Sequence, residues 1–129
     1  MDQQKTVYET LGGAEGVRAL AREFYHLMDT LPDAQGIRRL HPEDLASSEE
    51  KLFLFLSGWL GGPPLFVEKY GHPRLRMRHF PFAIGQSEAD QWMLCMEQAL
   101  KIVGVADPLL SELTATLRKL ADHMRNRES

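Results

Sequence analysis

Residues 72–85 read His-Pro-Arg-Leu-Arg-Met-Arg-His-Phe-Pro-Phe-Ala-Ile-Gly and place His79 between two prolines. Pro73 can begin a short helix, because the first helical N–H has no partner in any case. Pro81 ends that helix, because the residue before a proline is pushed into an extended conformation. We therefore expect His79 in the last turn of a short helix or just past it.

Apolar side chains surround this histidine. Leu75 lies four residues earlier on the same helical face, and Phe82 and Ile84 follow in an extended stretch that can turn them to the same side. An imidazole bound to haem iron needs such a setting, with one ring nitrogen on the metal, the other in a hydrogen bond, and apolar atoms beneath the macrocycle. The residues alone leave a second interpretation open, which is an ordinary surface or core histidine.

Length and composition predict one globular domain. The chain has 129 residues, of which 43% are hydrophobic and 26% are charged. A chain of this size buries about two-thirds of the surface that it exposes when unfolded, which suffices for one core. We expect a single domain over residues 1–129, with frayed ends at 1–6 and 126–129.

Charge and hydropathy exclude several classes of protein. A net charge of −3 leaves no basic surplus for a nucleic-acid backbone, and the cluster of Arg74, Arg76 and Arg78 suffices only for one or two carboxylates. No run of about 18 apolar residues is present, so we expect no membrane span. The polar residues 1–5 lack the features of a signal peptide. We expect a cytoplasmic protein without nucleic-acid or membrane partners.

Cys95 is the single cysteine of the chain, so an internal disulfide is impossible. This agrees with a reducing compartment. Apolar neighbours should raise the pKa of the thiol rather than lower it, and we do not expect a catalytic role for Cys95.

Apolar residues at three- and four-residue spacing predict four amphipathic helices. Their apolar stripes run over Val17–Met28, Leu52–Trp59, Trp92–Val103 and Leu110–Met124. Ser47 and Ser87 are predicted to cap the second and third helices, and Asp107 the fourth. No segment alternates with period two, so the fold class is all-α. A plain four-helix bundle is one possibility, but it would rarely tolerate the weakly helical section 60–86 at its centre.

Three polar aromatic side chains, Tyr25, His41 and Trp92, come from three separate elements. Each has an ordinary interpretation. Tyr25 could lie at a rim with its hydroxyl in water, and Trp92 could be core with its indole N–H on a carbonyl. His41, held extended before Pro42, could be exposed in a loop.

Motifs along most of the chain, from Val7 to Met124, resemble the second group of the truncated haemoglobins. The motifs are Tyr8-Glu-Thr-Leu-Gly-Gly13, Phe24-Tyr25, Leu60-Gly-Gly-Pro63, Arg74–Ile84 and Asp90-Gln-Trp-Met-Leu-Cys-Met96. The resemblance implies one truncated globin domain, folded as a two-over-two helical sandwich around a haem. In that family the middle section is mostly loop and is organised by the cofactor.

By this resemblance, His79 is the iron ligand of haem b (iron protoporphyrin IX). The distal side then carries Tyr25, Trp92 and His41, and the histidine is a variation, since the family often has tyrosine there. Their O–H and N–H groups would stabilise the partly negative outer atom of bound dioxygen. A histidine of near-neutral pKa would also make ligand affinity depend on pH.

The resemblance also implies the remaining cofactor contacts. Ser48 and Leu52 match the two positions that face the iron. Propionate contacts are expected from Lys51, Arg78, Arg76 and Tyr70, although each of the charged residues can also be simply solvated. Further contacts with the haem are expected from Phe24, Phe55, Leu75, Phe82, Ile84 and Met96.

Several donors around one ligand argue for retention and reaction of oxygen more than for bulk delivery. The expected ligands are dioxygen, nitric oxide, carbon monoxide and peroxide. Storage competes with nitric oxide dioxygenation, peroxide chemistry or nitrite reduction, and turnover needs a separate reductase, because the chain has no G-x-G-x-x-G motif and no room for a flavin domain. The alternative is a non-haem helical regulatory or partner-binding module.

Overall fold

The computed structural model describes residues 6–72, 74, 79 and 84–126, and every regular element in these ranges is helical. The elements are α1 (Val7–Thr10), α2 (Gly13–Thr30), a 3₁₀ turn (Pro32–Ala34), α3 (Gln35–Arg38), α4 (Ala46–Trp59), α5 (Leu65–Tyr70), α7 (Gln86–Ile102) and α8 (Leu109–His123). The predicted all-α class is confirmed.

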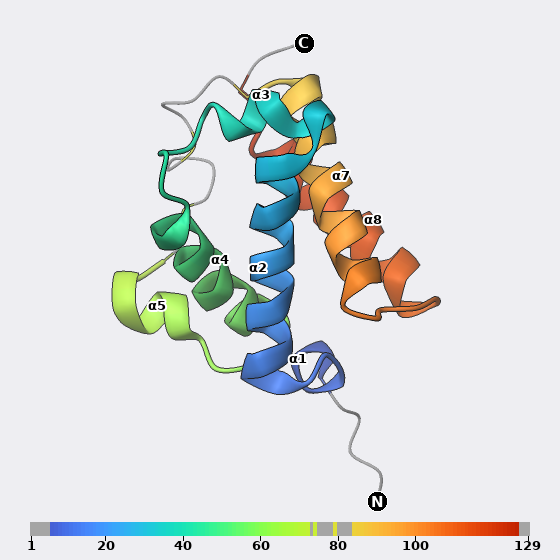
Figure 1. The fold of residues 1–129 in the computed structure, drawn as a ribbon. Helices are drawn as coiled ribbons and strands as arrows, with labels where there is room; N and C mark the ends of the chain where they lie inside the picture. The colour runs from blue at the N-terminus through green and yellow to red at the C-terminus, as the bar shows by residue number, and fades with distance from the viewer. Residues whose placement is uncertain (1–5, 73, 75–78, 80–83, 127–129) are drawn as a thin grey trace, which may run out of the picture.

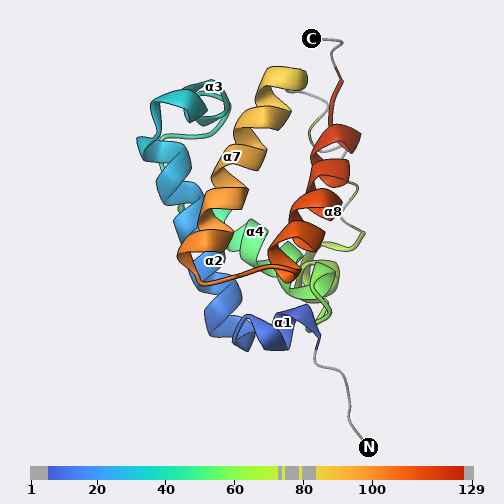
Figure 2. The same cartoon turned by 90° about the vertical axis from the view of Figure 1, so that its right-hand side faces the viewer.

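Four long helices form two layers. Helix α2 packs against both α4 and α7, and α7 packs against α8. Figure 1 shows α2 between α4 on one side and α7 with α8 on the other. Turned by 90°, Figure 2 shows α7 and α8 side by side in front of α2 and α4. This is the predicted two-over-two sandwich.

The apolar stripe of α2 forms the centre of the core, as its spacing predicts. Val17, Ala21, Phe24 and Met28 are all fully buried. Helix α7 adds the buried side chains of Met96, Ala99 and Leu100, and α8 adds Leu113, Leu117 and Ala121. Because the stripes of these helices face one another, a single core joins the two layers.

The orientation of α4 differs from the prediction. Its buried residues are Phe53, Leu54, Leu56 and Ser57, with the Ser57 hydroxyl donating to the carbonyl of Phe53 at 2.8 Å. Of the predicted stripe only Leu56 is buried, while Leu52, Phe55 and Trp59 are half-buried. The helix is apolar on more than one side, so spacing alone could not show which side packs against α2.

The predicted caps of α4 and α7 are each wrong by two residues, because the N-cap positions are Leu45 and Gly85. Helix α4 begins at Ala46, and Asp44 Oδ1 accepts the N–H of Ala46 at 2.9 Å, so Ser47 is not the cap. Helix α7 begins one residue before Ser87, where Glu88 accepts the N–H of Gly85 at 2.7 Å. In both cases a nearby carboxylate, and not the serine hydroxyl, accepts a backbone N–H at the start of the helix.

The N-cap position of α8 is Pro108, one residue later than the predicted Asp107, although the Asp107 carboxylate still accepts a backbone N–H of the first turn. Oδ1 of Asp107 accepts the N–H of Ser111 at 3.0 Å, and the helix starts at Leu109. Gly104, with a φ of +95°, closes α7 in the left-handed region that favours glycine.

The short helix α1 closes over the end of α4. The N–H of Tyr8 donates to the carbonyl of Leu60 at 2.9 Å. A Cβ atom on Gly62 would lie 2.5 Å from the Tyr8 ring, so this approach requires glycine. The two glycine-bearing motifs near Tyr8 and Leu60 therefore meet in space.

Both predicted frayed ends include a residue with defined hydrogen bonds. The side-chain oxygen of Thr6 accepts the N–H of Glu9 at 3.1 Å, and Asn126 is hydrogen-bonded to Ile84. The rest of the two ends lies outside the described residues. Within the part of the chain that the structure describes, no helix is long and apolar enough to cross a bilayer.

Candidate functional site

The predicted iron ligand, His79, is helical and half-buried. Its charge contributes to lowering the pKa of His41, so the two imidazoles lie within electrostatic reach of one another. The structure thereby brings the predicted iron ligand toward one of the predicted distal residues. Four predicted contacts lie outside the described residues: Leu75, Arg76, Arg78 and Phe82.

The three predicted distal residues lie in one row of rings together with Phe24, which we call the aromatic row. The ring centroids of His41 and Tyr25 are 5.7 Å apart, and those of Tyr25 and Phe24 are 4.9 Å apart, both edge to face. Phe24 and Trp92 follow at 5.3 Å with tilted planes. The row joins α2, α7 and the loop after α3, and the fully buried Phe24 anchors it in the core.

Tyr25 is buried, with 8% of its surface exposed, and is not the rim residue of the ordinary interpretation. Burial raises the pKa of its hydroxyl well above the usual range, and the negative charge of Glu49 raises it further. The hydroxyl is therefore protonated at neutral pH. It makes no hydrogen bond with any residue that the structure describes, so its proton is available for a group placed beside the row.

His41 has a defined tautomer. Its Nδ1 lies 2.8 Å from the carbonyl oxygen of Ile37, which can only accept, so Nδ1 carries the proton. The pKa of the ring is lowered chiefly by burial, against which the Ile37 hydrogen bond acts, and also by the positive charges of Arg38 and His79. A neutral ring of this tautomer has only a lone pair at Nε2. In this neutral tautomer Nε2 can accept a hydrogen bond, and only the doubly protonated ring would donate from it.

Gln91 places this histidine relative to α7. Its Oε1 accepts the N–H of Ile37 at 2.9 Å, and its Nε2 donates to Ser87 at 3.0 Å. Gly36 allows the approach, since a Cβ there would lie 2.6 Å from the Gln91 amide. Gln91 and His41 are thus both hydrogen-bonded to the backbone of Ile37, Gln91 to its N–H and His41 to its carbonyl oxygen.

Trp92 is half-buried at the other end of the row. Among the described residues its indole N–H has no hydrogen-bond partner, so the ordinary interpretation of an indole paired with a carbonyl does not hold there. Trp92 and Tyr25 are then the two donors of the aromatic row that remain available. Met96, one turn after Trp92, is fully buried in the core.

One face of α4 carries Ser48, Leu52 and Phe55, all of them half-buried. Their spacing of four and three residues places them in a line along the helix. The first turn of α4 lies near the aromatic row, because the charge of Glu49 acts on Tyr25. This face thus offers one small polar and two apolar side chains beside the row.

Lys51 is exposed next to that face, and its Nζ lies 6.0 Å from the ring centroid of Tyr70. Phe66 of α5 links the two helices, because its ring packs edge to face on Phe55 at 6.5 Å and against Tyr70 at 4.9 Å. A cation and a phenol therefore lie together at the edge of the apolar face.

These residues fit a haem. The buried Tyr25 hydroxyl and the Trp92 indole offer unpaired donors, Leu52 and Phe55 offer a half-buried apolar face, and His79 offers an imidazole. Iron porphyrins need an axial imidazole, apolar contacts with the ring and polar groups on the ligand side.

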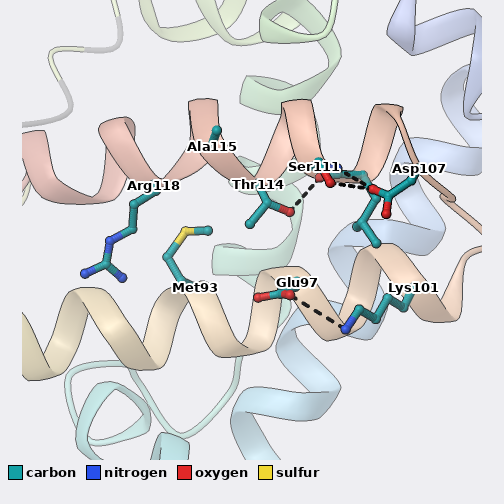
Figure 3. Close-up of a pocket in the computed structure, with 9 residues that line it drawn as sticks. Met93, Glu97, Lys101, Asp107, Ser111, Thr114, Ala115 and Arg118 are labelled. Carbon is teal, nitrogen blue, oxygen red and sulfur yellow. Dashed lines mark hydrogen bonds and ion pairs between the residues drawn. The ribbon is translucent and has the colours of Figure 1, made fainter.

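A separate groove runs between α7 and α8, on the outer side of that pair (Figure 3). Its walls include Met93, an ion pair between Glu97 and Lys101 at 3.6 Å, and Arg118. None of the predicted site residues lines this groove. We therefore place the candidate site at the aromatic row.

Comparison with known proteins identifies the family. The family model of bacterial-like globins matches residues 6–126. The group 2 truncated hemoglobin YjbI of Bacillus subtilis (strain 168) is 38% identical over 119 residues, which cover 92% of this chain and 87% of that protein. The chain belongs to the group II truncated haemoglobins.

Solved structures of other truncated haemoglobins share its fold. A cold-adapted truncated hemoglobin from Pseudoalteromonas haloplanktis TAC125 matches with a TM-score of 0.92 and 48% identity, over 96% of this chain and 100% of that one. A group II 2-on-2 hemoglobin from Agrobacterium tumefaciens matches with a TM-score of 0.91 and 48% identity, over 98% of each chain. The predicted resemblance is confirmed. As a globin, this truncated haemoglobin is a haem-based ligand-binding protein, and globins bind diatomic gases such as oxygen.

Sequence reasoning did not identify two polar residues near the site of this truncated haemoglobin, Gln91 and Asn126. Gln91 lies beside Trp92 inside a predicted helix, where a glutamine is ordinarily a solvated residue. Asn126 lies in a predicted frayed end. The sequence offered little indication of either role, because the hydrogen-bond partners of both residues are distant in the sequence.

Proposed function

We propose that this truncated haemoglobin binds haem b through His79 and holds a diatomic ligand beneath Tyr25 and Trp92. The observation that carries the proposal is the aromatic row, in which a buried, protonated phenol with no described partner stands near an indole with none. A ligand that pairs with these two donors in a site of low polarity would gain binding free energy from each hydrogen bond.

Ferrous haem held by His79 would supply an iron with an open coordination position for dioxygen, nitric oxide or carbon monoxide. Tyr25 and Trp92 would each donate one hydrogen bond to a ligand there, each contributing about 1–3 kcal/mol. Leu52 and Phe55 would keep water from the same space. Low polarity around the donors strengthens their effect.

The role of His41 differs from that of the two donors. With Nδ1 committed to Ile37, its neutral ring can accept a proton at Nε2 but not give one. It can take a proton from a protonated ligand such as hydrogen peroxide. A proton acceptor beside two donors suits redox chemistry of oxygen, nitric oxide or peroxide better than simple delivery.

Two donors on one ligand also slow its release, which favours retention and reaction. Sustained turnover with nitric oxide requires a separate reductase to return the iron to the ferrous state. Lys51, with Tyr70 beside it, and Arg78 would meet the propionates.

Purification from haem-replete cells, followed by optical spectra of the ferric, ferrous and carbonyl forms, tests the proposal. We expect a Soret band that is lost in His79→Ala and kept in His26→Ala, the matched control, since His26 is exposed on α2. Added imidazole should restore the band in His79→Gly. A colourless wild-type protein of normal helix content would favour the non-haem module, and a His79→Ala protein with an unchanged spectrum would assign the iron to another ligand.

A further inference from the structure

Asn126 lies just past the end of α8 and is hydrogen-bonded to the segment that carries His79. Its backbone N–H donates to the carbonyl oxygen of Ile84 at 2.7 Å, and its Oδ1 accepts the N–H of Ile84 at 2.9 Å. Its Nδ2 donates to the carbonyl oxygen of His79 at 3.4 Å. One asparagine thus contacts both the histidine and the end of the stretch that follows it.

The pairing with Ile84 is bidentate. Both backbone polar groups of Ile84 are satisfied by the same residue, and two parallel hydrogen bonds fix orientation as well as distance. Ile84 is itself buried, so breaking this pairing would leave polar groups away from water. The two hydrogen bonds therefore fix both the position and the orientation of the Ile84 backbone.

The end of α8, from which Asn126 extends, is packed firmly in the core. Leu117, Ala121 and Met124 bury the last turns of α8 in the core, and α8 packs along α7. The last backbone turns of α8 are closed by their own bonds, from Met124 to Ala121 and from Arg125 to Asp122. The Asn126 amide is therefore not needed to cap the helix, and it points instead to residues of the His79 segment.

We propose that Asn126 is a positioning residue that sets how the His79 imidazole is presented to the haem iron. The inference rests on the proposed function, in which His79 is the iron ligand. Asn126 acts through the backbone of that segment, because its side-chain Nδ2 donates to the His79 carbonyl and its N–H and Oδ1 pair with Ile84. Partners that hydrogen-bond a metal-ligating side chain commonly contribute about 10–100-fold to metal affinity, and Asn126, which contacts the backbone instead, is expected at the lower end of that range.

Asn126→Asp and Asn126→Ala separate the two side-chain hydrogen bonds, one to the Ile84 N–H and one to the His79 carbonyl. Aspartate keeps an oxygen for the Ile84 N–H but replaces the Nδ2–H donor by an oxygen that faces the His79 carbonyl. Alanine removes both side-chain hydrogen bonds. His123→Ala is the matched control, since His123 is an exposed residue at the end of the same helix.

Three measurements are made on each variant: the iron–histidine stretching vibration of the ferrous form by resonance Raman, the rate of haem transfer to excess apomyoglobin, and amide exchange of Ile84. We expect a shifted or broadened vibration and about tenfold faster haem loss in both Asn126 variants. Exchange at Ile84 should accelerate in Asn126→Ala and stay near wild type in Asn126→Asp. His123→Ala should match wild type throughout.

An unchanged vibration and haem-loss rate in Asn126→Asp would overturn the positioning role, and this variant carries the test alone if Asn126→Ala does not fold. That result leaves the proposed function intact, because the wild-type vibration itself reports a histidine on the iron. A wild-type protein that lacks the vibration would remove the proposed function first.

Discussion

Nδ1 of His41 donates to the carbonyl oxygen of Ile37 at 2.8 Å, and this one bond decides which nitrogen of the ring faces the site. Gln91 accepts the N–H of the same Ile37 at 2.9 Å. The peptide at Ile37 therefore connects α7 to the histidine. While the His41 ring is neutral, its Nε2 atom can therefore only accept a hydrogen bond.

The first prediction concerns this tautomer. In the diamagnetic carbonyl form at neutral pH, nitrogen-15 NMR should show His41 protonated at Nδ1 and bare at Nε2. His26, which is exposed on α2, is the internal control. A His41 ring protonated at Nε2 alone would mean that the Ile37 bond does not persist when a ligand is bound.

A second prediction concerns the donors. Tyr25→Phe and Trp92→Phe should each raise the dioxygen dissociation rate about tenfold, since each removes one hydrogen bond to a ligand in a site of low polarity. Stopped-flow replacement of dioxygen by carbon monoxide measures this rate. Tyr8→Phe and Trp59→Phe are matched controls outside the aromatic row and should leave it unchanged. Rates that do not respond to either aromatic-row substitution would place the donors elsewhere.

The third prediction tests the contact between α1 and the end of α4. Gly62→Ala should lower the free energy of unfolding by about 1–3 kcal/mol, because the new methyl group meets the Tyr8 ring at 2.5 Å. Urea titration followed by circular dichroism measures the change. Tyr8→Ala removes the obstacle, so the double variant should lose less stability than the sum of the two single variants. Strict additivity would show that the two residues do not interact.

The fourth prediction concerns Cys95. Burial raises the pKa of its thiol to about 11, in keeping with the apolar neighbours seen in the sequence. Since the reactive form is the thiolate, iodoacetamide should label the folded protein very slowly at pH 8, and labelling should become fast in guanidinium chloride. Mass spectrometry measures the extent of labelling. Rapid labelling of the folded protein would mean that the thiol is accessible and ionised.

Much of the fold follows from local pattern. The spacing of apolar residues predicts α2, α7 and α8 and the members of their buried faces, because a helix has a fixed period that the sequence repeats. Glycines and prolines predict where the helices end. The three residues predicted to face the bound gas could be named from the resemblance, and the structure brings all three into one row.

Other features depend on how the helices dock. The side of α4 that packs against α2 was not readable from spacing, since the helix is apolar on several sides. The burial of Tyr25 and the position of Gln91 against Ile37 require α2, α3 and α7 to meet. The grip of Asn126 on Ile84 and His79 joins residues far apart in the chain. Periodicity is a property of neighbouring residues and can be read from the chain alone, whereas the partner of a buried polar group is chosen only when distant segments come together and exclude water.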